Sequence, residues 1–117
     1  MDALVNHIPV WPRKCGIKLP LVILAIVGKG GGQGPQHSKN LTSWFHKFEG
    51  WTVCVPQTPL QAYWMMRSSI LGDSPVMYVA HREAFDSETF VRLENPDHIG
   101  LCGASPRHER DFYKPRI

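Results

Sequence analysis

The residues of this chain best suited to chemistry are a histidine and the glycines that precede it. Residues 28–35 read Gly-Lys-Gly-Gly-Gly-Gln-Gly-Pro, and His37 follows two positions later. An imidazole changes its charge near neutral pH and can move a proton, while glycine lets the backbone approach a ligand or a second chain closely. Lys29 is followed by Gly30, where a phosphate-binding loop needs Ser or Thr. The segment is therefore either a poor match to a phosphate loop or a flexible turn, and its spacing leaves both open.

A histidine is more often a surface or capping residue than a catalytic one, so its position matters. His37 stands between an apolar run that ends at Val27 and a helical pattern that begins near Leu41. A helix amino terminus at the carboxyl end of a strand favours anions and developing negative charge, which makes His37 a candidate catalytic residue. His81 and Glu83 follow another apolar run and form either an acid–base pair or part of a polar rim.

Three apolar runs, at residues 20–27, 51–56 and 75–80, predict strands. The first has no polar alternation, which predicts a central parallel strand covered on both faces. Helical patterns lie between the runs, with short connections. This alternation predicts an α/β fold in which helices flank a parallel sheet, with ligands at the carboxyl ends of its strands.

Two helices are expected between these strands. The first has an apolar face of Leu41, Trp44, Phe45 and Phe48 and stops at Gly50. Thr58, Pro59 and Gln61 supply a cap, a first-turn proline and a capping box for the second. This second helix is expected to end at Gly72, with one face formed by Ala62, Met66, Ser69 and Ile70.

Composition narrows the class of protein. The net charge of +3 and the pI of about 8.9 reflect scattered basic residues, which favours solvated surface charge over a nucleic-acid interface. Residues 19–27 are apolar, but a membrane-spanning helix needs about 20 apolar residues. Cys15, Cys54 and Cys102 are odd in number and widely spaced, which indicates a reducing, cytoplasmic setting.

Longer stretches of the chain resemble a known family. They are the run of residues 21–45 that contains Gln36-His37-Ser38, the run Glu49-Gly-Trp-Thr-Val-Cys-Val-Pro-Gln-Thr-Pro, and the run Asp73-Ser-Pro-Val-Met-Tyr-Val-Ala-His-Arg. Together these runs resemble the transketolase-like pyrimidine-binding domain, above all in the beta subunits of pyruvate and branched-chain 2-oxo acid dehydrogenases. The resemblance covers residues 2–85, and residues 1–85 are expected to form a partial, incomplete domain of this type. Residues 86–117 are expected to be a poorly ordered tail or the lead-in to a missing carboxyl-terminal domain.

The resemblance implies a function and a set of partners. Such enzymes are α2β2 heterotetramers that bind thiamine diphosphate and magnesium between subunits. They decarboxylate a 2-oxo acid and pass the acyl group to lipoyl-lysine of the acyltransferase component. His37 matches the family histidine that faces the reacting end of the cofactor, where a proton donor is useful. The expected partners are an alpha subunit, a second beta subunit and the lipoyl domain, with no nucleic acid and no membrane.

The resemblance also implies a potassium site, and one residue of the family's active site is missing from this sequence. Potassium is bound in the family through backbone carbonyls, and the matching positions are Leu21, Ser69, Ile70, Gly72 and Ser74. The family glutamate that activates the aminopyrimidine lies upstream of Met1, so the chain alone is expected to be inactive.

Two alternatives stay open: another transketolase-type thiamine enzyme, such as one that cleaves acetoin, or a truncated fragment without catalysis. Without its partners the chain is expected to expose apolar surface at Trp44, Phe45, Trp64 and Met65.

Overall fold

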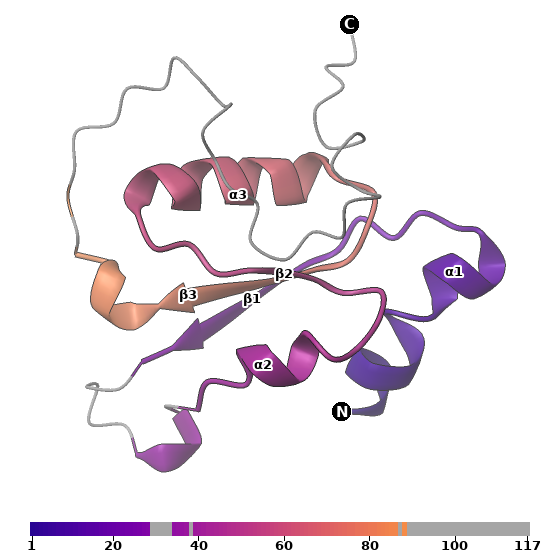
Figure 1. The fold of residues 1–117 in the computed structure, drawn as a ribbon, viewed down its shortest axis with the longest axis horizontal. Coiled ribbons are helices and arrows are strands. Elements are labelled where there is room, and N and C mark those ends of the chain that lie inside the picture. The colour runs from indigo at the N-terminus through magenta and orange to yellow at the C-terminus, as the bar shows by residue number, and fades with distance from the viewer. Residues whose placement is uncertain (29–33, 38, 87, 89–117) are drawn as a thin grey trace, which may run out of the picture.

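The computed structural model describes residues 1–28, 34–37, 39–86 and 88. Strands β1 (Val22–Val27), β2 (Thr52–Cys54) and β3 (Val76–His81) are parallel and lie in the order β1-β3-β2. Helix α3 (Pro59–Leu71) covers one face of the sheet and helix α2 (Thr42–Phe45) lies on the other (Figure 1). The predicted α/β fold, a parallel sheet with flanking helices, is confirmed.

The amino-terminal segment forms two short helices beside the sheet. They are a π-helical turn, η1 (Ala3–His7), and α1 (Trp11–Cys15), which has a proline in its first turn. The indole N–H of Trp51 donates to the carbonyl of Leu4 (2.8 Å) and ties η1 to the chain just before β2. Pro12 is tolerated in the first turn of α1, because backbone N–H groups in a first turn have no partner within the helix and proline lacks this N–H.

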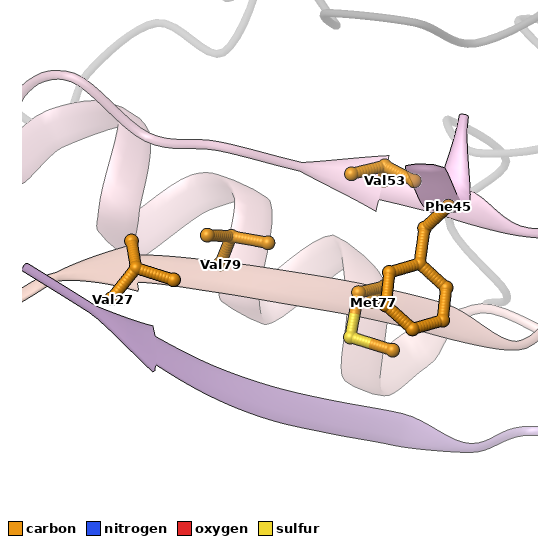
Figure 2. Close-up of a cluster of buried hydrophobic side chains, with 5 residues drawn as sticks. All are labelled: Val27, Phe45, Val53, Met77 and Val79. Carbon is orange, nitrogen blue, oxygen red and sulfur yellow. The ribbon is translucent and has the colours of Figure 1, made fainter. Parts of the chain in front are cut away.

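Alternate residues of the strands point to opposite faces and build two apolar cores. On the α2 side the buried residues are Val27, Phe45, Val53, Met77 and Val79. Figure 2 shows the ring of Phe45 reaching from α2 to Met77 of the central strand. On the α3 side the buried residues are Cys54, Met65, Val76 and Tyr78.

The prediction that the first apolar run forms a central strand covered on both faces was wrong for the described part of the chain. β3 lies in the middle and pairs with both other strands, whereas β1 pairs with β3 alone. Leu24 and Ile26 are 53% and 44% exposed. They lie on the α3 side of the sheet. The buried cluster on that side is built from β2, β3 and α3, and Val22 is the β1 residue that packs against it.

The helix predicted around Phe45 is shorter than expected. α2 has four residues, and its carboxyl end tightens into turns in which Lys47 and Phe48 donate to carbonyls three residues back. Phe45 is buried by the sheet, while Leu41 and Trp44 on the predicted face are exposed. The apolar spacing correctly predicted that Phe45 packs on the sheet. The helix is short because the chain turns toward β2 directly after Phe45.

The second predicted helix is confirmed as α3, with its predicted start. Thr58 accepts a hydrogen bond from the Gln61 amide (3.2 Å), and Pro59 occupies the first turn. The Gln61 side chain accepts from the amide of Gln57 (2.8 Å), so the capping arrangement reaches one residue further back than the usual box. On the face predicted to contain Ala62, Met66, Ser69 and Ile70, Ser69 is buried and Ile70 is exposed. Met65 and Ser69 are the helix residues buried against the sheet.

Tyr78 gives the buried core a measurable pH dependence. Its hydroxyl donates to the carbonyl of Ala62 (2.9 Å), and burial, with a smaller contribution from nearby Cys54, raises the pKa of the phenol. As the pH rises, the phenol of the unfolded chain ionises before that of the folded protein. The contribution of neutral Tyr78 to the free energy of unfolding is therefore fully present below pH about 10 and is lost above it.

At pH 7, Tyr78→Phe is expected to lower the free energy of unfolding by about 1 kcal/mol through the lost hydrogen bond. Above pH about 10 the difference should shrink, because only the tyrosine protein is destabilised by ionisation of its unfolded state. Urea unfolding of both proteins at pH 7 and at alkaline pH measures this. A difference that stays constant with pH would contradict the assignment.

Some predictions concern residues outside this description. The tail or lead-in at residues 86–117 has only Asp86 and Glu88 within the described ranges, and Cys102 lies outside them. Among the described helices, none combines the length and the apolar character needed to cross a membrane.

Candidate functional site

The carboxyl ends of β1 and β3 meet at one edge of the sheet. Val27, the last residue of β1, is the register partner of His81, the last residue of β3. The 3-10 turns η2 (Pro35–His37) and η3 (Arg82–Ala84) lie at the end toward which both arrows point in Figure 1. In open α/β sheets this edge is where ligands bind, so the structure brings the predicted histidine segment and the His81–Glu83 segment to the same edge.

His37 lies at the end of η2, between this edge and the start of α2. Its amide donates to the carbonyl of Gly34 (3.3 Å), and its side chain is exposed rather than packed among apolar groups. The carboxamide of Asn40 accepts from the amide of Thr42 (3.0 Å) and from its hydroxyl, which caps the start of α2. The imidazole is therefore accessible to a ligand or to a second chain, as a proton-transfer group must be.

The second candidate pair, His81 and Glu83, differs in solvent exposure. His81 and Arg82 are half-buried and Glu83 is exposed. A Cβ atom placed on Gly28 would lie 3.1 Å from one carboxylate oxygen of Glu83, so this carboxylate lies beside the backbone that leaves β1. Sequence reasoning missed this contact, although Gly28 is the first residue after β1 and Glu83 the second after β3. The contact can be expected only when β1 and β3 are known to be neighbours with Val27 opposite His81.

The five positions matched to a potassium site lie at the opposite, amino-terminal edge of the sheet. Leu21 precedes β1, and its carbonyl accepts from the amide of Val76 (2.7 Å) at the start of β3. Ser69 and Ile70 are in the last turn of α3, while Gly72 and Ser74 belong to the connection from α3 to β3. Ser69 packs over the face of the sheet, with its hydroxyl 3.8 Å from Cys54 Sγ. The hydroxyl of Ser69 is buried and donates to the carbonyl of Met65 (2.6 Å).

A salt bridge lies beside this edge. Lys18 contacts the carboxylate of Asp73 (2.6 Å), and the carbonyl of Asp73 accepts from the amide of Leu19 (2.9 Å). Both side chains are largely exposed, so solvent screening makes the pair a weak contributor to stability. Within the ranges that the structure describes, no three His, Cys, Asp or Glu side chains converge as metal ligands.

The sequence of the chain is similar to those of several characterised proteins. It is 26% identical over 98 residues to the 3-methyl-2-oxobutanoate dehydrogenase subunit beta of Mycobacterium tuberculosis, which covers 82% of this chain and 28% of the relative. It is 33% identical over 85 residues to the chloroplastic pyruvate dehydrogenase E1 component subunit beta-3 of Oryza sativa subsp. japonica, covering 73% of this chain and 21% of the relative. The chain is homologous to beta subunits of 2-oxo acid dehydrogenases.

The resemblance to 2-oxo acid dehydrogenase beta subunits is therefore confirmed at modest identity. No protein-family model matches the chain. A further relative is the beta subunit of acetoin:2,6-dichlorophenolindophenol oxidoreductase of Cupriavidus necator, 33% identical over 69 residues, which are 59% of this chain and 20% of that protein. The chain matches between about a fifth and 28% of the length of these beta subunits.

Proposed function

We propose that the chain is part of the beta subunit of a thiamine-diphosphate-dependent 2-oxo acid dehydrogenase, which decarboxylates its substrate oxidatively and transfers the acyl group to lipoyl-lysine. The observation that carries the proposal is the exposed imidazole of His37, between the carboxyl end of β1 and the start of α2, in a chain whose relatives are such beta subunits. On this proposal residues 1–85 form a partial pyrimidine-binding domain, in a cytoplasmic protein.

His37 is the proposed catalytic residue. Decarboxylation and acyl transfer develop charge on oxygen and on sulfur, and an imidazole can supply or accept a proton at those atoms near neutral pH. The neighbouring structure favours a fixed position, because Asn40 caps the helix that follows and Phe45 anchors that helix on the sheet.

The cofactor fits this chain only in part. Thiamine diphosphate supplies carbanion chemistry when bound. The ring of His37 is exposed, as a side chain that faces the reacting end of this cofactor must be. Magnesium needs carboxylate oxygens or water, and the described residues contain no convergent set of such side chains. As the resemblance implies, thiamine diphosphate and magnesium would be shared with the alpha subunit, with His37 acting across the subunit boundary.

Association with partners is the second requirement. An alpha subunit, a second beta subunit and the lipoyl domain of the acyltransferase complete the proposed heterotetrameric enzyme. Leu24 and Ile26, exposed on the α3 side of β1, give apolar surface of the kind that subunit contacts bury.

Reconstitution tests the function. The chain is mixed with thiamine diphosphate, magnesium, the alpha subunit of a matching dehydrogenase and the remaining segments of its beta subunit, which supply the activating glutamate. Decarboxylation of a 2-oxo acid is then followed. His37→Ala is expected to reduce the rate about 100-fold, at the lower end of what one general acid–base group contributes. His46→Ala is the matched control, because His46 is also exposed and directly follows α2; its rate should equal that of the wild type.

The same experiment separates the alternatives. Turnover of acetoin with 2,6-dichlorophenolindophenol as acceptor, and none of 2-oxo acids, would favour the acetoin-type enzyme to which the Cupriavidus necator relative points. Failure to bind any alpha subunit in gel filtration would favour a non-catalytic fragment. Equal rates for wild type and His37→Ala would remove the role proposed for the histidine.

We propose potassium binding by the carbonyls of Leu21, Ser69, Ile70, Gly72 and Ser74. Support comes from the last turn of α3, where carbonyls lack intrahelical partners and the helix dipole favours a cation. Replacing sodium by potassium at constant ionic strength is expected to raise the melting temperature by a few degrees, since a ligand that binds only the folded state stabilises it. Identical melting curves in the two salts would exclude the site.

A further inference from the structure

One edge of the described sheet is formed by β1. Among the described strands β1 pairs with β3 alone, and Figure 2 shows β1 and β2 on opposite sides of β3. The amide of Val76 donates to the carbonyl of Leu21 (2.7 Å), which fixes the alternation of this parallel ladder. As a result, the backbone N–H and C=O groups of Val22, Leu24 and Ile26 point away from β3, toward the open edge.

The same strand exposes apolar side chains on the α3 side of the sheet. Leu24 is 53% exposed and Ile26 is 44% exposed, whereas Val22 packs against the buried cluster of that side. A strand that presents outward backbone groups together with apolar side chains is a template for pairing with another strand. One added strand would satisfy the outward groups of Leu24 and Ile26 and partly shield their side chains.

β1 has none of the features that usually protect an edge strand. Such strands are commonly short or carry charged residues or proline. β1 has six residues, Val-Ile-Leu-Ala-Ile-Val, with neither a charged residue nor a proline. β2, at the opposite edge, has only three residues, of which Val53 and Cys54 are buried. Within the described sheet, β1 is therefore the edge at which another strand can add.

The chemistry of β1 suits a second copy of β1. Two identical strands related by a two-fold axis run antiparallel, and each supplies acceptors for the donors of the other. An axis through Leu24 places Leu24 opposite Leu24 of the second copy and Val22 opposite Ile26, so the outward groups of all three residues gain partners. Because β1 contains no charged residue, the net charge of +3 on each chain places no like charges opposite each other in this pairing.

We propose that the chain forms a symmetric dimer in which β1 pairs antiparallel with β1 of a second copy about Leu24, so that two three-stranded sheets become continuous. Each copy offers one such edge, so the assembly closes at two chains. A six-residue strand is about 20 Å long, and its pairing buries less than the roughly 800 Å² per partner of a standard interface. A micromolar dissociation constant is therefore expected. The dimer does not depend on the function proposed for His37.

Sedimentation equilibrium of the full chain tests the assembly. Between about 1 and 200 μM the mean mass is expected to rise from 13.3 kDa toward twice that value. Leu24→Lys should keep the chain monomeric, because like charges directly opposite each other destabilise strand pairing. Leu71→Lys is the matched control, since Leu71 is 71% exposed at the end of α3; it should dimerise as the wild type does. A wild-type chain that stays monomeric, or that forms larger oligomers, would overturn the proposal.

Charge reversal at the same position tests the register. Leu24→Glu alone is expected to be monomeric, for the same reason as Leu24→Lys. An equimolar mixture of the two variants should restore the dimer, because residue 24 faces itself only when the axis passes through it, and opposite charges then pair across the strands. A mixture that remains monomeric while the wild type dimerises would overturn the proposed pairing.

Hydrogen exchange of single amides in the wild-type chain covers the case in which a Leu24 variant does not fold. The amides of Leu24 and Ile26 point outward, so concentrating the chain should slow their exchange about fivefold as the dimer forms. The amides of Ile23 and Ala25 face β3 in the ladder and are the internal control, with little change expected. A dimer in which the amides of Leu24 and Ile26 exchange as fast as in the monomer would assign the contact to another surface and overturn the proposal.

Discussion

Gly50→Ala is expected to lower the free energy of unfolding by about 3 kcal/mol, the sum of left-handed backbone strain and forced repacking. Gly50 has a φ of +104°, and an added Cβ would lie 2.2 Å from the carbonyl oxygen of Pro9. That oxygen belongs to the backbone of a buried residue, so it cannot rotate away. The amino-terminal segment would have to leave its place beside the start of β2.

Gly16→Ala provides the matched control for this substitution. Gly16 also has a positive φ, +65°, but an added Cβ there would meet nothing within 4 Å. It should cost only the backbone strain, about 1 kcal/mol. Urea unfolding of the full chain compares the two variants. Equal losses would show that the approach of Pro9 to Gly50 has no energetic consequence, contrary to the packing described.

Phe45→Ala is expected to cost about 4 kcal/mol, within the range for removing a buried phenylalanine. Phe45 is 7% exposed and packs in the cluster that contains Val53 and Met77. Its ring also makes an edge contact with Trp51 (centroids 6.0 Å apart). Because α2 is only four residues long, it has little stability of its own, and this ring is its main attachment to the sheet.

Phe85→Ala is the control with the same change of side chain. Phe85 is 57% exposed at the end of η3, and substitutions at such positions usually change stability by about 0.5 kcal/mol or less. Both variants are measured by urea unfolding with fluorescence and circular dichroism. A Phe45→Ala protein as stable as Phe85→Ala would mean that the α2 side of the sheet is not a packed core.

The contrast between Phe45 and Leu24 shows where sequence reasoning succeeded and where it did not. Periodicity placed Phe45 on an apolar helix face, yet Phe45 and Met65 were also expected to be exposed without partners, and that expectation was wrong, because both are buried within this chain. Leu24 was expected to be covered and is not. Burial depends on which element packs opposite a residue, and a local pattern carries no information about that neighbour.

The candidate site divides in the same way. His37 was identified from its residue type, from the glycines before it and from the resemblance, and the structure adds that its ring is exposed near the carboxyl edge. Its catalytic role stays a prediction. The approach of Glu83 to Gly28 could not be predicted, because the two residues are far apart in sequence and meet only through the pairing of β1 with β3.

By itself the sequence determined the three strands, the capping of α3 by Thr58 and the parallel α/β class, because apolar periodicity, capping side chains and turn residues act over a few neighbouring positions. Only the tertiary structure decided the strand order β1-β3-β2, the exposed face of β1 and the contact between Gly50 and Pro9. These features depend on which distant segments pack together, and that choice is made by the free energy of the whole chain rather than by any one segment.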